Sequence, residues 1–553
     1  MNNMSPQTTI SLAGVRGWCL RNGLDRRTLR ALHREAHLIC MARLLHYVFL
    51  EHLCDEQITC EACQGDLRLS LGVGPRLELH LSGNAPQVYF ELLANPWLLD
   101  AGQRRELAWS GAFLRALGQV LAGTPYGQYL PALVLDYRNS FCNLILNLAL
   151  GRRTPQPGCA LEPVCRGHGY YPFPALRIGP SIQDVVEISN LSPEPVPLFL
   201  VNAAGFRFHS SEHVDPQSCA ALWGGEAMAS QEGLLPVHPW QLRLSPVIRE
   251  LLRRDLISLA PVRLPVVPLA SQRTCRVLAT GYDIKLSLDA TLTGERRLLY
   301  RLNSHNAPFV SSVVREIHRR SEITSIGFQY DVASLCWDDV LVSEHLSAIV
   351  RAPCPVAAGE EVVPALNLWA PAGQAATLLK LDCHQDRLDT FQRYARAVMS
   401  GPVLLCAQWG ICLEPHMQNS CIVLRGGQPV RLLLRDLDST IMDPARVRPI
   451  CEEQRIPLAP DTWVHMPDPS IGQGRLIHAM LHGHLYPVMH WLIKYRGMSL
   501  AELERCLDET WQGLAESLGN APGQHHLQRL RARVGSTKHS LSMRLKQSST
   551  MSF

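Results

Sequence analysis

The sequence predicts an α+β fold in which a central, mainly antiparallel sheet lies between two helical regions. Three observations lead to this prediction. Apolar residues recur at helical spacing in 24–53, strand-like runs broken by turn residues dominate from about 182 to 350, and helical patterns return in 386–409, 475–495 and 499–518. A chain of 553 residues exceeds the size at which one hydrophobic core stops growing, so we expect two or three domains.

The N-terminal region combines helices with a small sheet. Segment 66–100 alternates apolar and polar residues in LRLSLGV and LELHLSG, which predicts strands, while 102–122 and 133–151 have the pattern of helices. A Pro- and Gly-rich stretch at 154–181 ends this region. The Pro, Gly and Ala content of 352–374 predicts a linker or a lid between the strand-rich and the helical regions.

Composition narrows the class of protein. Hydrophobic residues make up 46% of the chain and charged residues 18%, which is typical of a globular protein. The net charge is only +4 and no long basic run is present, so nucleic acid is not expected as a partner. The sequence contains no run of 18 apolar residues, so a membrane-spanning helix is not expected. The N-terminus lacks the pattern of a secretory signal, and eighteen cysteines are then expected as reduced thiols in the cytoplasm.

The densest polar segment is EPHMQN at 414–419, followed by RDLD at 435–438. A strand pair is expected around 411–438. In a strand, Glu414, His416 and Gln418 would lie on one face, and Asp436 and Asp438 would likewise share a face. Such groups are costly to bury without partners. Either they form a polar strand with a salt-bridged turn, or they bind a charged ligand together with a metal ion. Mg²⁺ held through one or two carboxylates would suit a phosphate ligand.

A second cluster lies roughly 140 residues upstream. Ser271, Arg273 and Thr274 are followed by Lys285 and, after a turn, by Arg297. Cations and hydroxyl groups on short strands suit a polyanion such as a triphosphate, because arginine can bind phosphate oxygens with two parallel hydrogen bonds. The alternative is that these cations lie on solvated strand faces. No Gly-x-x-x-x-Gly-Lys-Ser/Thr sequence is present, so a P-loop is excluded.

Two further motifs contain histidine. The loop around His168, between two glycines and near two tyrosines, could offer an imidazole to a substrate, although a lone histidine is more often structural. The sequence HPWQ at 238–241 is interpreted chiefly as a structural corner in the strand-rich region, since proline fixes the backbone and tryptophan anchors packing.

Together and in this order, these motifs resemble those of the NRPS-independent siderophore synthetases, the aerobactin-synthetase-like (IucA/IucC) family. The resemblance spans roughly residues 130–545 and rests on the following motifs: the loop 167–179, HPWQ at 238–241, Ser-x-Arg-Thr at 271–274, Lys285 with Arg297, EPHMQN at 414–419, RDLD at 435–438, and Lys538 with Met-Arg-Leu at 543–545.

The resemblance implies a three-domain architecture shaped like a cupped hand. A mixed N-terminal thumb domain would span residues 1–180. The fingers domain, which contains the ATP-binding antiparallel sheet, would span 181–374, and a mainly helical palm domain would span 375–553. The implied cofactors are ATP and Mg²⁺. Family members often pair as homodimers, although no heptad pattern in this sequence indicates it.

The resemblance also implies roles for individual residues. It implies catalytic or substrate-binding roles for His168, Thr293, Arg297 and His416, nucleotide-binding roles for Ser271, Arg273, Thr274, Lys285, Gln418, Asn419 and Asp436, and metal-binding roles for Glu414 and Asp436. The implied reaction is attack of a carboxylate of citrate, or of a citrate derivative, on the α-phosphate of ATP. An amine or alcohol would then attack the acyl-adenylate and release AMP.

One loop departs from the family pattern, which reads Gly-His-Pro-x-His-Pro-x-x-Lys-x-Arg. Here Gly169, Tyr171 and Ala175 replace the first proline, the second histidine and the lysine, while His168 and Arg177 remain. The changes leave open which acid is accepted. A member that activates 2-oxoglutarate and a catalytically altered ligand-binding homologue remain alternatives. A kinase-like phosphotransferase is disfavoured, because a glycine-rich loop and an Asp-Phe-Gly segment are absent.

Overall fold

The structure is a computed structural model that describes residues 10–533 and Leu541 apart from short gaps. The gaps are 52, 54–57, 64–65, 72–73, 82–90, 123, 125, 157, 160, 203–205, 211–223, 225–233, 338, 371–372, 458–467 and 520. The closing motif of the family resemblance, at Lys538 and 543–545, lies outside the described residues.

The N-terminal region contains four helices and a five-stranded sheet of order β1-β2-β3-β4-β5. Their bounds are α1 Leu12–Arg21, α2 Arg26–Leu50, α3 Ser110–Leu121, α4 Leu130–Leu150, β1 Ile58–Cys63, β2 Asp66–Leu71, β3 Arg76–Leu81, β4 Trp97–Asp100 and β5 Gln103–Glu106. The helices predicted at 24–53 and 133–151 are thus confirmed. The helix predicted at 102–122 is wrong in its first part, because Ala101 and Gly102 have positive φ values of 47° and 77° and turn the chain back into strand β5.

The predicted central antiparallel sheet is confirmed, with eight strands in the order β8-β16-β17-β12-β11-β10-β7-β9, all paired antiparallel. The strands are β7 Val196–Asn202, β8 Phe206–Ser210, β9 Leu234–Val237, β10 Ser258–Pro268, β11 Thr274–Val277, β12 Asp283–Leu286, β16 Asp331–Trp337 and β17 Ser347–Arg351. Beside it lies a three-stranded sheet, β14-β13-β6, made of β6 Arg177–Ile178, β13 Leu288–Leu292 and β14 Glu295–Arg297.

Helices also occur within the region predicted as strand-rich. They are α5 Ile182–Glu187, α7 Pro239–Leu244, α8 Pro246–Arg253, α9 Arg301–Ser321 and the short α10 Val340–Ser343. The HPWQ motif begins α7 instead of turning the sheet, because the side chain of His238 accepts a hydrogen bond from the backbone N–H of Trp240 and caps the helix. Its role is nevertheless structural: Gln241 donates to the carbonyl of His345 at 2.9 Å.

The segment 352–374 is not simply a linker or a lid. It contributes strand β18 Glu361–Pro364 to a four-stranded sheet, β15-β21-β20-β18, together with β15 Ile326–Phe328, β20 Ser420–Arg425 and β21 Gln428–Leu434. The strand pair predicted around 411–438 is confirmed as the β20–β21 hairpin. The domain boundaries at 180 and 374 stay a prediction.

The C-terminal region is mainly helical, as predicted. The remaining elements are α11 Ala365–Leu368, α12 Ala375–Leu378, α13 His384–Trp409, β19 Ile411–Cys412, β22 Ile441–Met442, α14 Pro444–Glu453, α15 Pro469–Ile477, α16 Tyr486–Arg496, α17 Leu500–Leu518 and α18 Ala521–Arg531. The helix predicted at 475–495 is interrupted by a π-helical turn, His478–Leu485, which joins α15 to α16. Such turns often lie at functional sites, and His478 lines the cavity described below.

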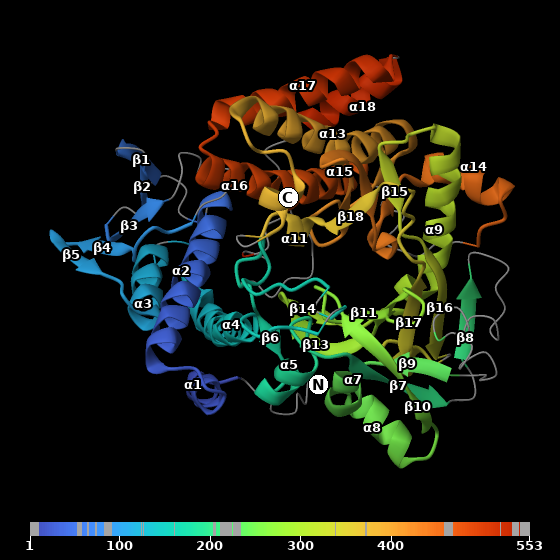
Figure 1. Ribbon diagram of the computed structural model, residues 1–553, viewed down its shortest axis with the longest axis horizontal. Helices are drawn as coiled ribbons and strands as arrows, with labels where there is room; N and C mark the ends of the chain where they lie inside the picture. Colours follow the sequence, from blue (N-terminus) through green and yellow to red (C-terminus); the bar gives the residue numbers. More distant parts are fainter. Residues whose placement is uncertain are drawn as a thin grey trace.

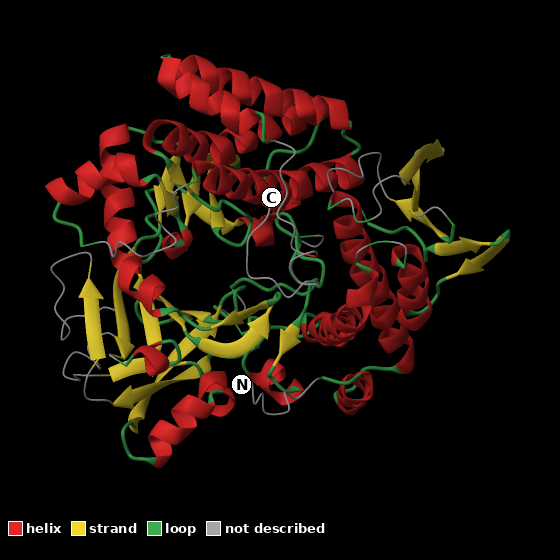
Figure 2. Cartoon of the chain, turned by 180° about the vertical axis from the view of Figure 1, so that it is seen from behind, coloured by secondary structure: helices red, strands yellow, loops and turns green. Residues whose placement is uncertain are grey.

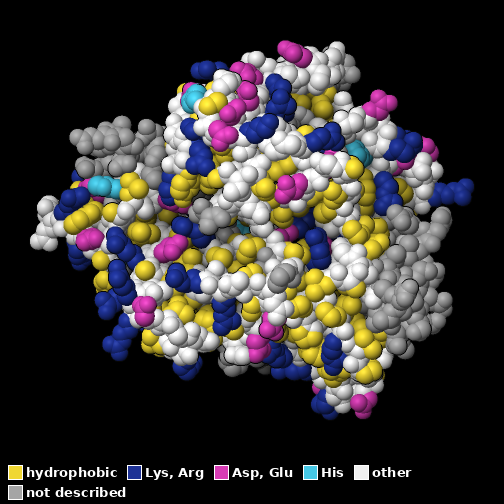
Figure 3. Space-filling model, viewed as in Figure 1, with side chains coloured by type: hydrophobic (Ala, Val, Ile, Leu, Met, Phe, Trp, Pro, Cys, Tyr) yellow, Lys and Arg dark blue, Asp and Glu magenta, His cyan; other side chains and the backbone are white. Residues whose placement is uncertain are grey.

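Two large hydrophobic cores hold these regions together. One joins the N-terminal helices to the eight-stranded sheet, and the other packs the C-terminal helices against the four-stranded sheet. Figures 1 and 2 show the N-terminal helices, the central sheet and the C-terminal helices arranged around a common middle. On the face seen in Figure 3, positive and negative side chains are interspersed. None of the described helices is long and apolar enough to cross a membrane.

Buried histidines make the fold sensitive to acid. Burial lowers the pKa of His37, His484 and His490 to about 4 and that of His238 to about 3. Between these values and the ordinary pKa near 6.5, the unfolded chain binds protons that the folded chain does not, so stability falls as the pH decreases through this window. Asp331, whose pKa burial raises to about 6, acts in the opposite direction.

We therefore expect the urea midpoint of unfolding to fall between pH 7 and pH 5. Each histidine contributes at most about 1.4 kcal/mol per pH unit below its unfolded pKa, and several histidines outweigh the single aspartate. Equilibrium unfolding at pH 7, 6 and 5, followed by tryptophan fluorescence, measures this. A midpoint that does not change over this range would show that these imidazoles are not held neutral.

Candidate functional site

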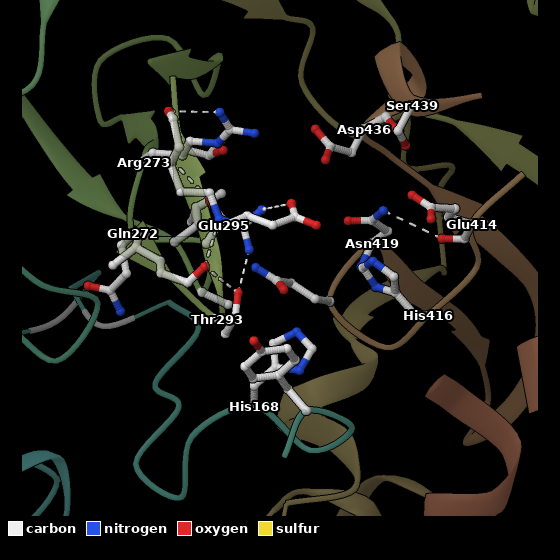
Figure 4. A pocket seen from close by; sticks show the side chains of 18 of the residues that line it. His168, Gln272, Arg273, Thr293, Glu295, Glu414, His416, Asn419, Asp436 and Ser439 are labelled. Atoms are coloured by element: carbon white, nitrogen blue, oxygen red, sulfur yellow. Dashed lines mark hydrogen bonds and ion pairs between the residues drawn. The ribbon is translucent and has the colours of Figure 1, made fainter. Parts of the chain in front are cut away.

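A cavity of about 380 Å³ lies where the three regions meet, a volume typical of small-molecule sites. Its walls come from the loop after α4, the strands β11–β14 and the segment 414–439. In Figure 4 Arg273 and Thr293, which lie in turns between strands, face His416 and Asp436 across the cavity, with His168 below them. Every site residue predicted from the sequence lines it: His168, Ser271, Arg273, Thr274, Lys285, Thr293, Arg297, Glu414, His416, Gln418, Asn419 and Asp436. Their individual roles stay predictions.

The turn between β10 and β11 presents Ser271 and Arg273. Gln272 between them has a φ of 68°, and the Ser271 hydroxyl accepts a hydrogen bond from the Thr274 N–H at 3.1 Å, which closes the turn. The Arg273 guanidinium donates to the carbonyl oxygen of Arg297 at 3.1 Å. Burial, and then the neighbouring charge of Arg297, lowers the pKa of Arg273. These two guanidinium groups therefore form a concentrated positive charge on one wall of the cavity.

The turn between β13 and β14 fixes Arg297. Thr293 and Gly294 have φ values of 49° and 85°, as in the tight turns that join antiparallel strands. The Arg297 guanidinium donates to the Thr293 hydroxyl and, at 3.1 Å, to the Leu292 carbonyl. Its ion pair with Glu295 is long, at 3.4 Å. The turn thus holds Thr293 and Arg297 as one preformed unit.

Lys285 lies in an ion-pair network. Its Nζ donates to Asp436 and Asp438 at 2.7 Å each, and Asp436 also accepts from Arg351 at 2.7 Å. The network continues to Asp331, which accepts from Arg351 at 2.8 Å. Burial alone would raise the pKa of Asp436, but Lys285 and Arg351 outweigh it and hold that pKa well below its ordinary value.

The two aspartates do not share a strand face as predicted. Strand β21 ends at Leu434, and Asp436 has a φ of 71°, which begins a 3₁₀ turn at Leu437–Ser439. This turn, and not strand alternation, directs both carboxylates at Lys285. In the network two cations face three carboxylates, counting Asp331, which leaves one excess negative charge beside the cavity. A divalent cation would compensate this charge, so the donor set fits Mg²⁺ held by one or two carboxylates and by phosphate oxygens.

The segment 414–419 is a turn, so the predicted strand is wrong here. Strand β19 ends at Cys412 and β20 begins at Ser420. The Nδ1 of His416 accepts from the Asn419 N–H at 3.2 Å, which leaves Nε2 to carry the proton. Burial lowers the pKa of His416 to about 4, so the ring is neutral at pH 7. The Glu414 carboxylate forms an ion pair with Arg475, and it would have to give up this cation to bind a metal.

Sequence reasoning missed a pair of residues that joins the two walls. Arg435 and Glu162 form a buried bidentate ion pair at 2.6 and 2.8 Å, although 273 residues separate them. Glu162 also accepts from the N–H of Ala270, next to the turn with Ser271, and Arg435 donates to the Gln418 carbonyl at 2.7 Å. Arg435 is therefore an anchor that positions both turns. No local pattern in the sequence pairs it with Glu162.

Tyr170 was missed as well. Its ring lies 5.2 Å from that of His416, and its hydroxyl oxygen is buried without a hydrogen-bond partner among the described residues. Burial raises the pKa of this hydroxyl well above its ordinary value, so it remains a donor. The neighbouring Tyr171 packs its hydroxyl against Gly294, so the residue that departs from the family pattern contacts the turn that carries Arg297.

Comparison with family models gives two matches. The model of the IucA/IucC family matches residues 159–370, and a model described as a ferric iron reductase FhuF-like transporter matches residues 391–552. The first match contains the loop with His168 and both turns of the strand wall, and the second contains His416 and Asp436.

Several curated proteins are similar in sequence. A D-ornithine–citrate ligase of Staphylococcus aureus (strain NCTC 8325 / PS 47) is 25% identical over 246 residues, 39% of this chain and 37% of the relative. The N(2)-citryl-N(6)-acetyl-N(6)-hydroxylysine synthase of Vibrio mimicus is 24% identical over 313 residues, 50% of this chain and 52% of the relative. The alignments thus span between about a third and a half of the curated relatives.

Solved structures agree over much more of the chain. The petrobactin biosynthesis protein AsbB of Bacillus anthracis str. Sterne matches with a TM-score of 0.77 at 15% identity, over 96% of this chain and 95% of its own. ATP-bound aerobactin synthetase IucA of Klebsiella pneumoniae matches with a TM-score of 0.70 at 16% identity, over 87% of this chain and 92% of its own. At this identity the agreement establishes the fold, and it confirms the predicted α+β class.

Proposed function

Since the chain belongs to the IucA/IucC family, we propose that it is an ATP-dependent ligase. It activates a carboxylate of citrate or of a citrate derivative and joins that carboxylate to an amine or a hydroxyl group, with release of pyrophosphate and AMP. The observation that carries the proposal is the convergence in one cavity of every residue to which the family resemblance gave a catalytic, nucleotide-binding or metal-binding role, from three regions of the chain. The names of the sequence relatives, which are citrate ligases and a citryl-lysine synthase, support the choice of acid.

The strand wall serves the first half-reaction. Arg273, with Ser271 and Thr274, binds the phosphates of ATP, while Thr293 and Arg297 hold the reacting carboxylate. A carboxylate oxygen attacks the α-phosphorus of ATP. The bond between the α-phosphorus and the oxygen that bridges it to the β-phosphate breaks, and pyrophosphate leaves. Charge develops on the phosphate oxygens, and fixed guanidinium groups stabilise it without reorganisation. Alignment of two anions in one cavity supplies a further part of the rate.

The opposite wall, formed by the segment 414–439, serves the second half-reaction. The amine or hydroxyl attacks the acyl carbon, AMP leaves with the electron pair of the acyl–oxygen bond, and the nucleophile loses a proton. His416 is neutral at pH 7 and offers Nε2–H as a hydrogen-bond donor, so it orients the acyl group. Gln418 and Asn419 face the nucleotide. Mg²⁺, when held at Asp436 and its neighbours, supplies positive charge beside the phosphates.

The test is a product assay with hydroxylamine as the acceptor. The protein with ATP, Mg²⁺, citrate and hydroxylamine is expected to form one citryl hydroxamate per pyrophosphate released, and omission of citrate should stop both. Omission of Mg²⁺ is expected to do the same. Formation of ADP and phosphate instead would reject adenylation. A panel that includes 2-oxoglutarate and partly amidated citrates identifies the acid.

A further inference from the structure

Arg177 is a buried cation that no carboxylate of the described residues neutralises. It is 5% exposed and lines the cavity. Its guanidinium donates to the side-chain oxygens of Asn143 at 2.9 Å and Asn147 at 3.5 Å. Within the described part of the chain no acidic side chain forms an ion pair with it. Burial lowers its pKa to about 10, so it keeps its charge at neutral pH.

A row of asparagines on α4 holds this cation. Asn139, Asn143 and Asn147 follow one another at four-residue spacing and therefore share one face of the helix. Asn139 accepts from the backbone N–H of Arg177 at 2.9 Å, and Asn143 donates to its carbonyl at 3.3 Å. Amides orient the guanidinium without cancelling its charge.

Two other buried arginines of the cavity differ. Arg351 pairs with two aspartates and Arg435 with Glu162. A buried charge without a counterion is costly. The contrast indicates that the counterion of Arg177 is a ligand.

The position of Arg177 relative to Arg297 indicates which kind of anionic ligand could contact both side chains. Both belong to the three-stranded sheet, Arg177 on β6 and Arg297 on β14, with β13 between them. Outer strands of such a sheet are roughly 10 Å apart, and two long side chains from them can bind the two ends of a small dicarboxylate or tricarboxylate. At position 175, where the family pattern has a lysine, this chain has alanine, so this end of the cavity holds one cation fewer.

We propose that Arg177 determines specificity by binding the second terminal carboxylate of citrate, the one that is not activated and that citramalate lacks. Arg297 holds the carboxylate that reacts, and Arg177, with the Asn147 amide, holds one that does not. With alanine at position 175, this subsite accepts a single carboxylate. The inference rests on the proposed function, because it assigns a part of the acid to the same cavity.

The first test compares two acids. Citramalate has the structure of citrate with one terminal carboxylate replaced by hydrogen. Wild type should prefer citrate in pyrophosphate release by about 10- to 100-fold in kcat/KM, the loss expected for one hydrogen-bonded charge. In Arg177→Gln this preference should fall to near one, because only citrate loses a contact, and the KM for ATP should not change. An equal loss for both acids, or a higher KM for ATP, would overturn the proposal.

The variant Asn147→Asp distinguishes a role of Arg177 in binding the acid from a purely structural role. This isosteric change places a carboxylate beside Arg177, so the melting temperature should stay the same or rise. The KM for citrate should nevertheless increase at least tenfold, with that for citramalate unchanged. If Arg177 were only structural, the variant would be as stable or more stable and would bind citrate as wild type does.

A third readout separates this inference from the proposed function. If wild type released no pyrophosphate with any acid, the proposed function would fail, and titration calorimetry with citrate alone would still decide the role of Arg177. Binding to wild type that Asn147→Asp weakens supports the anion subsite. Equal binding by both, or binding by neither, overturns it.

Discussion

Arg297→Ala is expected to lower pyrophosphate release by about 10²- to 10³-fold, the loss typical of removing one preorganised donor from a developing charge. The side chain is 26% exposed, and its partners are a hydroxyl, a backbone carbonyl and a distant glutamate. Its removal therefore leaves no buried carboxylate unpaired, and the melting temperature should change by no more than a few degrees. Steady-state kinetics with citrate and thermal unfolding of the same preparation measure both effects.

The adjacent Arg296 provides a matched control. It also borders the cavity, but its side chain is 54% exposed and its guanidinium is held by Asp289. Arg296→Ala removes the same charge from the same strand and should keep activity within a few-fold of wild type. Equal losses in the two variants would mean that net charge near the cavity matters and that Arg297 has no specific contact. A large fall in melting temperature for Arg297→Ala alone would mark that residue as structural.

The sequence predicts the composition of this site better than its geometry. Hydroxyl and guanidinium groups at 271–274, and polar groups at 414–419, are unusual among apolar strands, and that density, together with the family resemblance, marked both segments as ligand-binding. Alternation in the central region likewise predicted the antiparallel sheet. By contrast, α9 was not predicted, because RLNSHNAPF carries polar residues and an internal proline, and tertiary packing overrides its weak helix propensity.

The contacts that shape the cavity depend on pairing at long range. Lys285 meets Asp438 across 153 residues and Arg435 meets Glu162 across 273, and no local pattern encodes either pair. Backbone turns are similarly hidden: Asp436 has a left-handed conformation, and the two buried cations that hold its carboxylate in that conformation come from distant strands. The asparagines at four-residue spacing in 133–151 are a signal that could have been used, because buried amides need partners.

Lys285 is the clearest case in which the structure changes an expectation. From the sequence, Lys285 is a point charge for ATP phosphates, and its removal should weaken ATP binding. In the structure the side chain of Lys285 is 4% exposed, and its Nζ forms ion pairs with the carboxylates of Asp436 and Asp438. Lys285→Met should therefore also destabilise the fold, by about 3–5 kcal/mol, because it leaves the buried carboxylate of Asp438 uncompensated, while Asp436 keeps Arg351.

A second substitution distinguishes the two roles of Lys285. Asp438→Asn in the Lys285→Met background removes the carboxylate that has lost its cation, so urea unfolding should show that much of the lost stability returns. ATP binding, measured by calorimetry, should remain weak, since the cation that neighbours the phosphates is still missing. If the single variant unfolds at the wild-type urea concentration, the network does not hold the two walls together. If the double variant regains ATP affinity as well as stability, Lys285 acts only by positioning Asp436, and the phosphates are bound by Arg273 and its turn.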